Sequence, residues 1–367
     1  MVNTMDDRPN KILEYFKSQS ISSKSYDDSE AIPFFSNLEK ELEILHYGAG
    51  LRVLFNYSIV ELRGKDSLDF LHRITTNSLK EIKKEEVKQT IFTTEKGRIL
   101  SVATVFNFDT HQFLVVGKSN KERVLGWINK YIIADDVAMS DATGRFNIME
   151  LSGPQSGSFI TLVCGNIVND ISTNMFKVVN AEEILFFLSK ITDFNGRDKY
   201  WILADDDNTI KLINYMKENY GIFNFGLVGE EAYYEFRISM GIPAAPNEIN
   251  DKYNPHEANL IHLVDFKKGC YIGQEVIARL DTYSKVQKYL TGINFEDPVT
   301  AAHHFVLLDD KENEVGVVTS SVNSTRLNKP IGLAYINKNF TSPGTVLIAK
   351  NSEKVTKATV QELPFKK

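Results

Sequence analysis

A loop that carries a cysteine between two glycines and leads into a helix constrains this chain more than any other stretch. Residues 265–279 read Asp-Phe-Lys-Lys-Gly-Cys-Tyr-Ile-Gly-Gln-Glu-Val-Ile-Ala-Arg. Good helix formers from Gln274 onward predict a helix start, and Gly269 and Gly273 let the backbone approach closely without a Cβ. Adjacent lysines and a helix N-terminus favour the thiolate, so Cys270 is a candidate reactive thiol. A small buried residue filling a turn is the competing interpretation.

The length and composition of the chain predict an ordinary globular protein with more than one domain. At 367 residues it exceeds what a single core usually supports, and 43% hydrophobic with 25% charged residues is a typical composition. A net charge of -6 argues against a broad nucleic-acid surface, so no direct nucleic-acid partner is expected. No apolar run approaches the ~20 residues that span a bilayer, and two cysteines far apart favour a reducing compartment. We therefore expect a cytoplasmic protein without a membrane partner.

Order is expected to begin only after a polar lead-in. Residues 18–30 hold six serines and a short acidic cluster, too polar to bury much, so residues 1–30 are predicted to be a mobile segment. Ser36-Asn37-Leu38-Glu39 has the form of a capping box and predicts the first helix.

Strand and helix patterns fill the next part of the chain. Residues 58–62 predict a strand, and residues 91–94 and 99–108 predict two strands joined by a hairpin in which Gly97 adopts a positive φ. Ser119-Asn120-Lys121-Glu122 reads as a second capping box before an amphipathic helix.

The remaining patterns predict an α+β protein that ends in an all-β domain. Residues 146–220 read as strand, helix, two or three strands and helix, which suits a split-βαβ, ferredoxin-like unit. Residues 286–367 change to short strands separated by turn signals, which fits a small antiparallel barrel.

Several motifs together resemble a known family. Residues 268–275 followed by Arg279 resemble the signature of the YgfZ-like folate-binding proteins, relatives of the glycine-cleavage T-protein (GcvT), which is an aminomethyltransferase. The resemblance covers about residues 31–365. It continues in residues 94–100, 237–243, 254–258, 316–320 and 343–345.

The resemblance implies a three-lobed, aminomethyltransferase-like fold with tetrahydrofolate in a central hole. Residues 31–285 would form two intertwined α+β lobes, the second being the ferredoxin-like one, and residues 286–367 would be the C-terminal barrel. A flat pterin with an anionic glutamate tail needs an aromatic or apolar platform, an acidic or amide partner and a cation. Candidate folate-binding residues are Arg98, Arg237, Lys268, Gly269, Tyr271, Gly273, Gln274, Glu275 and Arg279.

The function implied by the resemblance is an accessory role in iron–sulfur cluster assembly or repair, extending to tRNA-modifying enzymes that carry clusters. Cys270 would be the essential thiol, either accepting a one-carbon or sulfur species or meeting a cluster-carrying partner; the sequence leaves this choice open. An iron–sulfur cluster needs about four cysteine or histidine ligands. With only Cys164 as its second cysteine, the chain would act through iron–sulfur enzymes or assembly proteins as partners.

Two departures from the T-protein pattern bear on the alternatives. Leu100 and Ser101 stand where the T-protein has a catalytic aspartate, and Ser239 stands where it has a glutamate that meets the pterin. A folate-dependent aminomethyltransferase is nevertheless the first alternative, and a scaffold that binds only protein is the second. No metal site is expected, because His303 and His304 have no carboxylate or cysteine at ligand spacing.

Overall fold

The structure is a computed structural model that describes residues 10–26, 29–192, 196–283, 285–299 and 305–366. The chain divides into two compact units. The first unit comprises residues 1–72, 78–90 and 103–233, and the second comprises residues 73–77, 91–102 and 234–367. Short segments from the front of the chain therefore belong to the unit that also holds the C-terminal third.

Helices and strands alternate through the front of the chain, and strands dominate its end. The helices are α1 (Lys11–Ser18), α2 (Leu38–Tyr47), α3 (Ser67–Ile74), α4 (Lys121–Tyr131), α5 (Ser156–Cys164), α6 (Asp206–Glu218), α7 (Glu230–Ser239) and α8 (Gln274–Thr282). The strands are β1 (Lys24–Tyr26), β2 (Ser29–Ala31), β3 (Ala49–Val53), β4 (Tyr57–Arg63), β5 (Val87–Thr93), β6 (Ile99–Asn107), β7 (His111–Gly117), β8 (Ala138–Asp141), β9 (Asn147–Ser152), β10 (Met175–Ala181), β11 (Ile184–Thr192), β12 (Asp198–Ala204), β13 (Phe225–Leu227), β14 (Lys288–Phe295), β15 (Val306–Leu308), β16 (Glu314–Ser324), β17 (Lys329–Asn337), β18 (Val346–Lys350) and β19 (Val355–Gln361).

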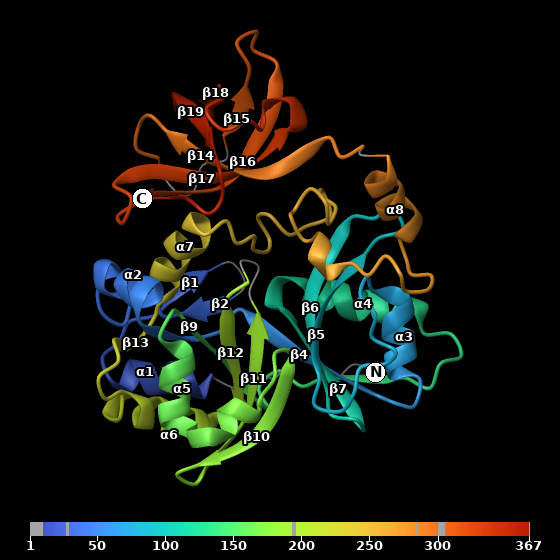
Figure 1. Cartoon of the computed structure of the whole chain (residues 1–367), viewed down its shortest axis with the longest axis vertical. Helices are drawn as coiled ribbons and strands as arrows, with labels where there is room; N and C mark the ends of the chain where they lie inside the picture. The colour runs from blue at the N-terminus through green and yellow to red at the C-terminus, as the bar shows by residue number, and fades with distance from the viewer. Residues whose placement is uncertain (1–9, 27–28, 193–195, 284, 300–304, 367) are drawn as a thin grey trace. The chain divides into compact units, whose positions relative to one another are not determined.

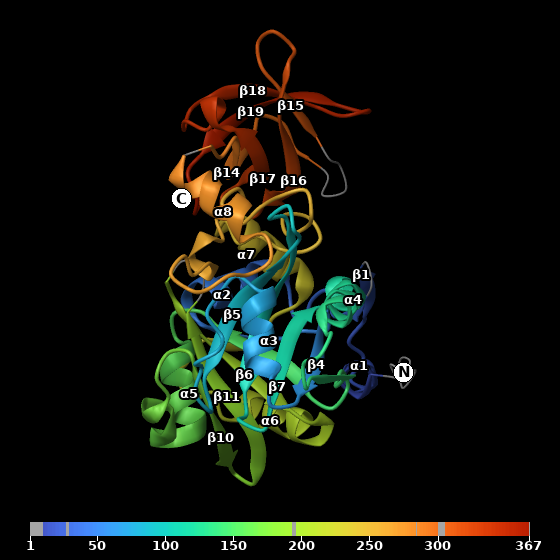
Figure 2. The same ribbon diagram turned by 90° about the vertical axis from the view of Figure 1, so that its right-hand side faces the viewer.

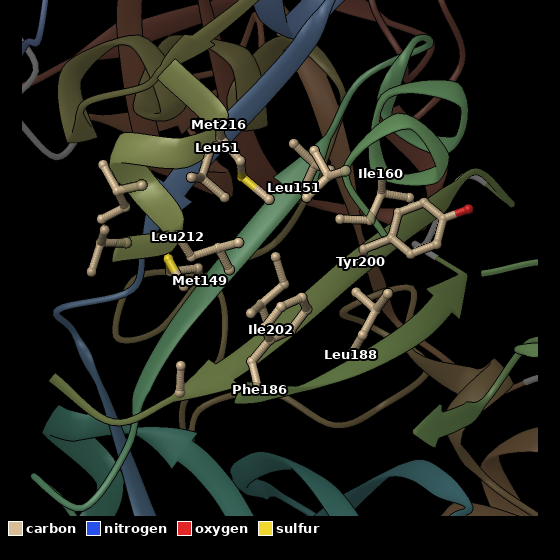
Figure 3. Packing of buried hydrophobic residues seen from close by; sticks show 14 of the residues in the cluster. Leu51, Met149, Leu151, Ile160, Phe186, Leu188, Tyr200, Ile202, Leu212 and Met216 are labelled. Atoms are coloured by element: carbon tan, nitrogen blue, oxygen red, sulfur yellow. The ribbon is translucent and has the colours of Figure 1, made fainter. Parts of the chain in front are cut away.

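A six-stranded sheet organises the first unit, in the order β10-β11-β12-β9-β3-β13. Neighbouring strands are antiparallel except β3 and β13, which are parallel. Helices α5 and α6 pack on one face, where Ile160, Leu212 and Met216 meet strand residues such as Leu188 and Ile202 (Figure 3). The order strand, helix, three strands, helix over residues 147–218 confirms the predicted pattern. Strands β3 and β13, from outside that range, extend the sheet beyond the unit expected there.

A second sheet, in the order β5-β6-β7-β4-β8, shares an aromatic core with the first. Phe106 and Phe113 from this sheet pack with Phe176 and Trp201 from the other. The predicted hairpin between β5 and β6 is present, with Gly97 at φ +67.

The C-terminal strands form a closed antiparallel barrel in the order β14-β17-β16-β15-β18-β19 (Figure 1 and Figure 2). Residues including Ile293, Leu307 and Ala334 contribute to a buried core of aliphatic side chains that also holds Phe295 and Phe305. The predicted α+β class with a C-terminal antiparallel barrel is therefore confirmed. None of the described helices is long and apolar enough to cross a membrane.

The prediction of a mobile lead-in is wrong for the described part of residues 1–30. Helix α1 is capped by Asn10, whose side chain accepts from the backbone N–H groups of Ile12 and Leu13. Ile12, Leu13 and Phe16 are buried in the core of the first unit. The prediction was based on the serine-rich residues 18–30, whereas the apolar residues of this helix come before them.

The two predicted capping boxes are also corrected. Asn37, not Ser36, caps α2 by accepting from the N–H of Lys40. At α4 the cap residue is Asn120, and it makes no side-chain capping bond. Both helices form where expected, so the pattern located them but not their caps.

Replacing Phe16 with alanine tests whether α1 belongs to the core. Phe16 is fully buried, so Phe16→Ala is expected to lower the free energy of unfolding by about 3–5 kcal/mol. Urea unfolding followed by circular dichroism measures the change. Lys11→Ala on the exposed side of the same helix is the control and should change stability by at most about 0.5 kcal/mol. A loss below about 1 kcal/mol for Phe16→Ala would contradict this packing.

Candidate functional site

The loop before α8 is held against the β5–β6 hairpin by close backbone contact within the second unit. Gly273 is the N-cap residue of α8 at φ +83, and a Cβ there would lie 2.5 Å from the carbonyl oxygen of Thr94. The Thr93 hydroxyl donates to the Ile272 carbonyl at 2.7 Å. Gly273 thus allows the close approach expected of it. Gly269 does not need to be glycine for this reason, because a Cβ there would meet nothing within 4 Å.

Lys268 fixes the other end of the loop. Its ammonium group donates to the carbonyl oxygens of Thr75 at 2.7 Å and Asn77 at 2.8 Å, and it lies 5.1 Å from the ring centre of Tyr271. The side chain is buried. These contacts make Lys268 an anchor for the loop, with little capacity left for a ligand.

Cys270 projects from this anchored loop as an exposed thiol. It precedes the first helical residue of α8 by four positions, so the helix start is confirmed at Gln274 but Cys270 is not in the first turn. Glu275 and Arg279 on α8 are exposed, and Gln274 is half-buried. The thiol and these α8 side chains are accessible, and part of the Arg98 side chain, which is 39% exposed, is accessible too.

Tyr271 turns inward beside the exposed cysteine. It packs with Val264 and Ile277, and burial raises the pKa of its hydroxyl to about 12, so the phenol stays neutral. Its hydroxyl has no hydrogen-bond partner among the described residues. Tyr271 therefore supports the loop through packing.

Two of the three predicted arginines, Arg98 and Arg237, are held in ion pairs. Arg237 is buried, with Nη1 3.0 Å from Glu248 Oε2 and Nη2 donating to the Ser320 hydroxyl at 2.8 Å. Arg98 Nη1 lies 2.9 Å from Glu257 Oε2 and donates to the Lys252 carbonyl at 3.0 Å. Each arginine therefore connects segments of the second unit that are far apart in the sequence.

The positions that lack acidic residues are buried and turned to the backbone. Leu100 is buried, and the Ser101 hydroxyl donates to the Val102 carbonyl at 3.0 Å. The Ser239 hydroxyl donates to the Phe236 carbonyl one turn earlier in α7. None of the three offers a carboxylate to a ligand.

Charged residues that the sequence analysis missed lie together in the first unit. Glu150 on β9 accepts from Lys199 Nζ at 2.7 Å and from Trp201 Nε1 at 2.9 Å, both on β12. Arg52 on β3 is buried near them. The available signal was a charged residue inside an apolar strand, as in Leu51-Arg52-Val53 and Met149-Glu150-Leu151.

No metal site emerges from the described part of the chain. Among those residues, no group of three or more histidine, cysteine, aspartate or glutamate side chains is placed to hold a metal ion. The His303–His304 pair lies outside the described residues.

Nearly the whole chain is similar to known proteins. Residues 13–268 match the GCVT N-terminal domain, and residues 288–367 match the glycine cleavage T-protein C-terminal barrel domain. An aminomethyltransferase from Chlorobium limicola is 26% identical over 339 residues, covering 90% of this chain and 91% of the relative. Another from Oceanobacillus iheyensis is 26% identical over 341 residues, covering 91% of each.

A solved structure supports the same fold. The crystal structure of glycine cleavage system aminomethyltransferase T from Bartonella henselae superposes with a TM-score of 0.81 and covers 97% of both chains. At 18% identity this likeness shows the fold alone. The predicted aminomethyltransferase-like fold is confirmed, whereas the YgfZ-like subgroup stays a prediction.

Thiol labelling should separate the two cysteines. Burial raises the pKa of Cys164 to about 12, so its thiol stays protonated at pH 7.5, whereas Cys270 is exposed. We expect N-ethylmaleimide to label native protein once, at Cys270, as read by mass spectrometry of peptides. Cys164→Ser should label like the wild type, and Cys270→Ser should label only in urea. Equal labelling of both cysteines in the native state would contradict the described burial.

Proposed function

This chain belongs to the glycine cleavage T-protein family, and from that membership we propose that it binds a reduced folate, tetrahydrofolate or a derivative of it. The observation that carries the proposal is the match to both family domains over residues 13–268 and 288–367. A reduced folate would supply a nitrogen that carries a one-carbon unit. The protein would bind and orient that ligand.

The second unit offers accessible groups for this role at the cysteine loop. Cys270, Glu275 and Arg279 are exposed, so they are free to meet a ligand or a partner protein. Arg98, Arg237 and Lys268 are engaged in the contacts described above, which leaves Arg279 as the accessible cation and Glu275 as the accessible acid among the candidate folate-binding residues.

The first candidate activity is aminomethyl transfer to tetrahydrofolate. Its support is the match, along about nine-tenths of the chain, to proteins named aminomethyltransferase. Leu100 and Ser101 argue against a mechanism that relies on an aspartate at those positions, because neither side chain can support developing charge as an ionised carboxylate does. A transfer reaction here would need another carboxylate.

The second candidate is an accessory role in iron–sulfur cluster assembly or repair, including tRNA-modifying cluster enzymes. A specific observation favours it: Cys270 is presented to solvent on a loop that Lys268 anchors. An exposed thiol on a fixed loop suits contact with a partner protein or acceptance of a small group. In this role the protein is expected to act in the cytoplasm with iron–sulfur enzymes or assembly proteins.

Anaerobic calorimetry with tetrahydrofolate tests ligand binding. We expect saturable heat with a dissociation constant between micromolar and millimolar, equivalent to roughly 4–8 kcal/mol. A parallel assay of lipoyl-dependent transfer to tetrahydrofolate separates the candidates, with robust turnover supporting aminomethyl transfer. No binding across this range would leave a protein-binding scaffold as the remaining interpretation.

Replacing Cys270 with alanine tests the accessory role. The side chain is exposed, so Cys270→Ala should leave folding and tetrahydrofolate binding unchanged while lowering the activity of iron–sulfur enzymes in cells that depend on this protein. Cys164→Ala, at the half-buried cysteine, is the matched control and should retain that activity. Full activity in cells carrying Cys270→Ala would remove the thiol from the mechanism.

A further inference from the structure

A tight turn that follows α6 holds a large apolar side chain almost entirely in solvent. Ile222 is 97% exposed. The N–H of Phe223 donates to the carbonyl oxygen of Tyr220 at 3.1 Å, which closes the turn, and Gly221 adopts φ +60 within it. The ring of Phe223 meets the buried ring of Phe159 edge to face, with ring centres 5.8 Å apart. The turn is therefore anchored in the core of the first unit, and the fold itself presents Ile222 to solvent.

A groove lies directly beside this turn, where the C-terminal ends of α5 and α6 meet (Figure 1). Its volume is about 360 Å³, near the lower end of the range for small-molecule pockets, so it can admit an aliphatic side chain. The groove is lined by aliphatic, aromatic and polar residues from α5, α6 and the turn, namely Leu162, Val163, Tyr215, Glu218, Asn219 and Gly221. Leu162 is 51% exposed, so the apolar wall of the groove is open to a partner.

Ile222 and the groove complement each other without meeting in one chain. Ile222 does not fill the groove of its own chain, because almost none of its surface is covered. Gly221, the residue before it, lines the groove, so the protruding side chain and the recess lie next to each other. A surface that carries both can pair with itself about a two-fold axis, because each copy offers its side chain to the recess of the other. The burial of apolar surface would drive this association.

The charges at the end of α6 favour a second copy over a strongly charged partner. Lys217 and Glu218 are both exposed, and neither has an ion-pair partner among the residues that the structure describes. An acidic or a basic partner would meet one charge of each sign here and gain no net attraction. Across a two-fold contact, in contrast, Lys217 of one copy can pair with Glu218 of the other.

We propose that the surface formed by Leu162, Tyr215, Glu218, Tyr220 and Ile222, here called the α5–α6 face, binds the same surface of a second copy of this chain. Ile222 of each copy enters the groove of the other. Such a contact belongs to the class of small, transient interfaces, which bury less than about 1,200 Å², so we expect a reversible dimer with a dissociation constant in the micromolar range. The inference does not depend on the proposed folate binding.

Sedimentation velocity of the full chain tests the association, from low micromolar to near-millimolar concentration. A reducing agent is present throughout, so that the exposed Cys270 cannot link two chains through a disulfide. We expect the average mass to rise with concentration from that of one chain toward that of two. A wild type that keeps the mass of one chain at the highest concentration overturns the proposal.

Substitutions on the α5–α6 face should weaken the dimer. Ile222→Asp removes the protruding apolar side chain, and Leu162→Glu adds a carboxylate to the groove that Glu218 lines, so each is expected to raise the dissociation constant about tenfold or more. Ile133→Asp is the matched control. Ile133 is 89% exposed in the first unit and does not line the groove, so this variant should change the constant less than about twofold. Thermal melting checks that each variant is folded.

An equimolar mixture of the two variants tests the insertion of Ile222 into the groove. The Ile222→Asp chain keeps an intact groove and the Leu162→Glu chain keeps an intact Ile222, so a heterodimer retains one of the two contacts. The mixture should therefore show a higher average mass than either variant alone at the same total concentration. Two variants that dissociate without recovery in the mixture would overturn the insertion, and wild-type association of both variants would assign the dimer to another surface. If Leu162→Glu does not fold, Leu162→Gln replaces it under the same criteria.

Discussion

The hydrogen bonds from the Lys268 ammonium to two backbone carbonyls fix the loop that presents the Cys270 thiol to solvent. A buried cation is costly unless its donors are met, and the carbonyl oxygens of Thr75 and Asn77 meet two of them at 2.7 and 2.8 Å. The bonds tie the loop to residues almost 200 positions earlier in the chain. Cys270, two residues further on, is therefore displayed from a fixed backbone while Tyr271 is buried beneath it.

Much of the fold was predictable because periodicity and turn chemistry are local. The hairpin at Gly97, the strand and helix order over residues 147–218 and the C-terminal barrel all follow from such patterns. The order of strands in the six-stranded sheet was not predictable, because β3 and β13 join it from distant parts of the chain. Helix α1 was not predicted for a different reason. Its eight residues carry only a short apolar stripe and are followed by a long polar run.

The sequence predicted a site residue where the residue type alone sets its chemistry. It did not where the role of a side chain depends on contacts with residues far away in the sequence. The sequence located Cys270 and the start of α8. It could not distinguish a ligand-binding cation from a structural one, because Arg98, Arg237 and Lys268 find their partners at remote positions: Glu257, Glu248 and the carbonyls near Asn77. Conversely, Arg52 and Glu150 looked like ordinary strand residues, and only the sheet brings β3, β9 and β12 side by side.

The positions that lack a carboxylate, Leu100 and Ser101, and the exposed Cys270 all belong to the second unit. Strand β6, which carries Leu100 and Ser101, follows the hairpin whose Gly97 approaches α8 so closely that a Cβ there would lie 3.2 Å from Val276 and Ile277 side-chain atoms. Gly273 makes the same contact from the helix side, because a Cβ added there would lie 2.5 Å from the carbonyl oxygen of Thr94. A larger residue at Gly273 would force the hairpin and the helix apart, moving strand β6 relative to the cysteine loop. The contact between the hairpin and α8 therefore sets where the second unit presents the exposed Cys270, while Leu100 and Ser101 on β6 stay buried.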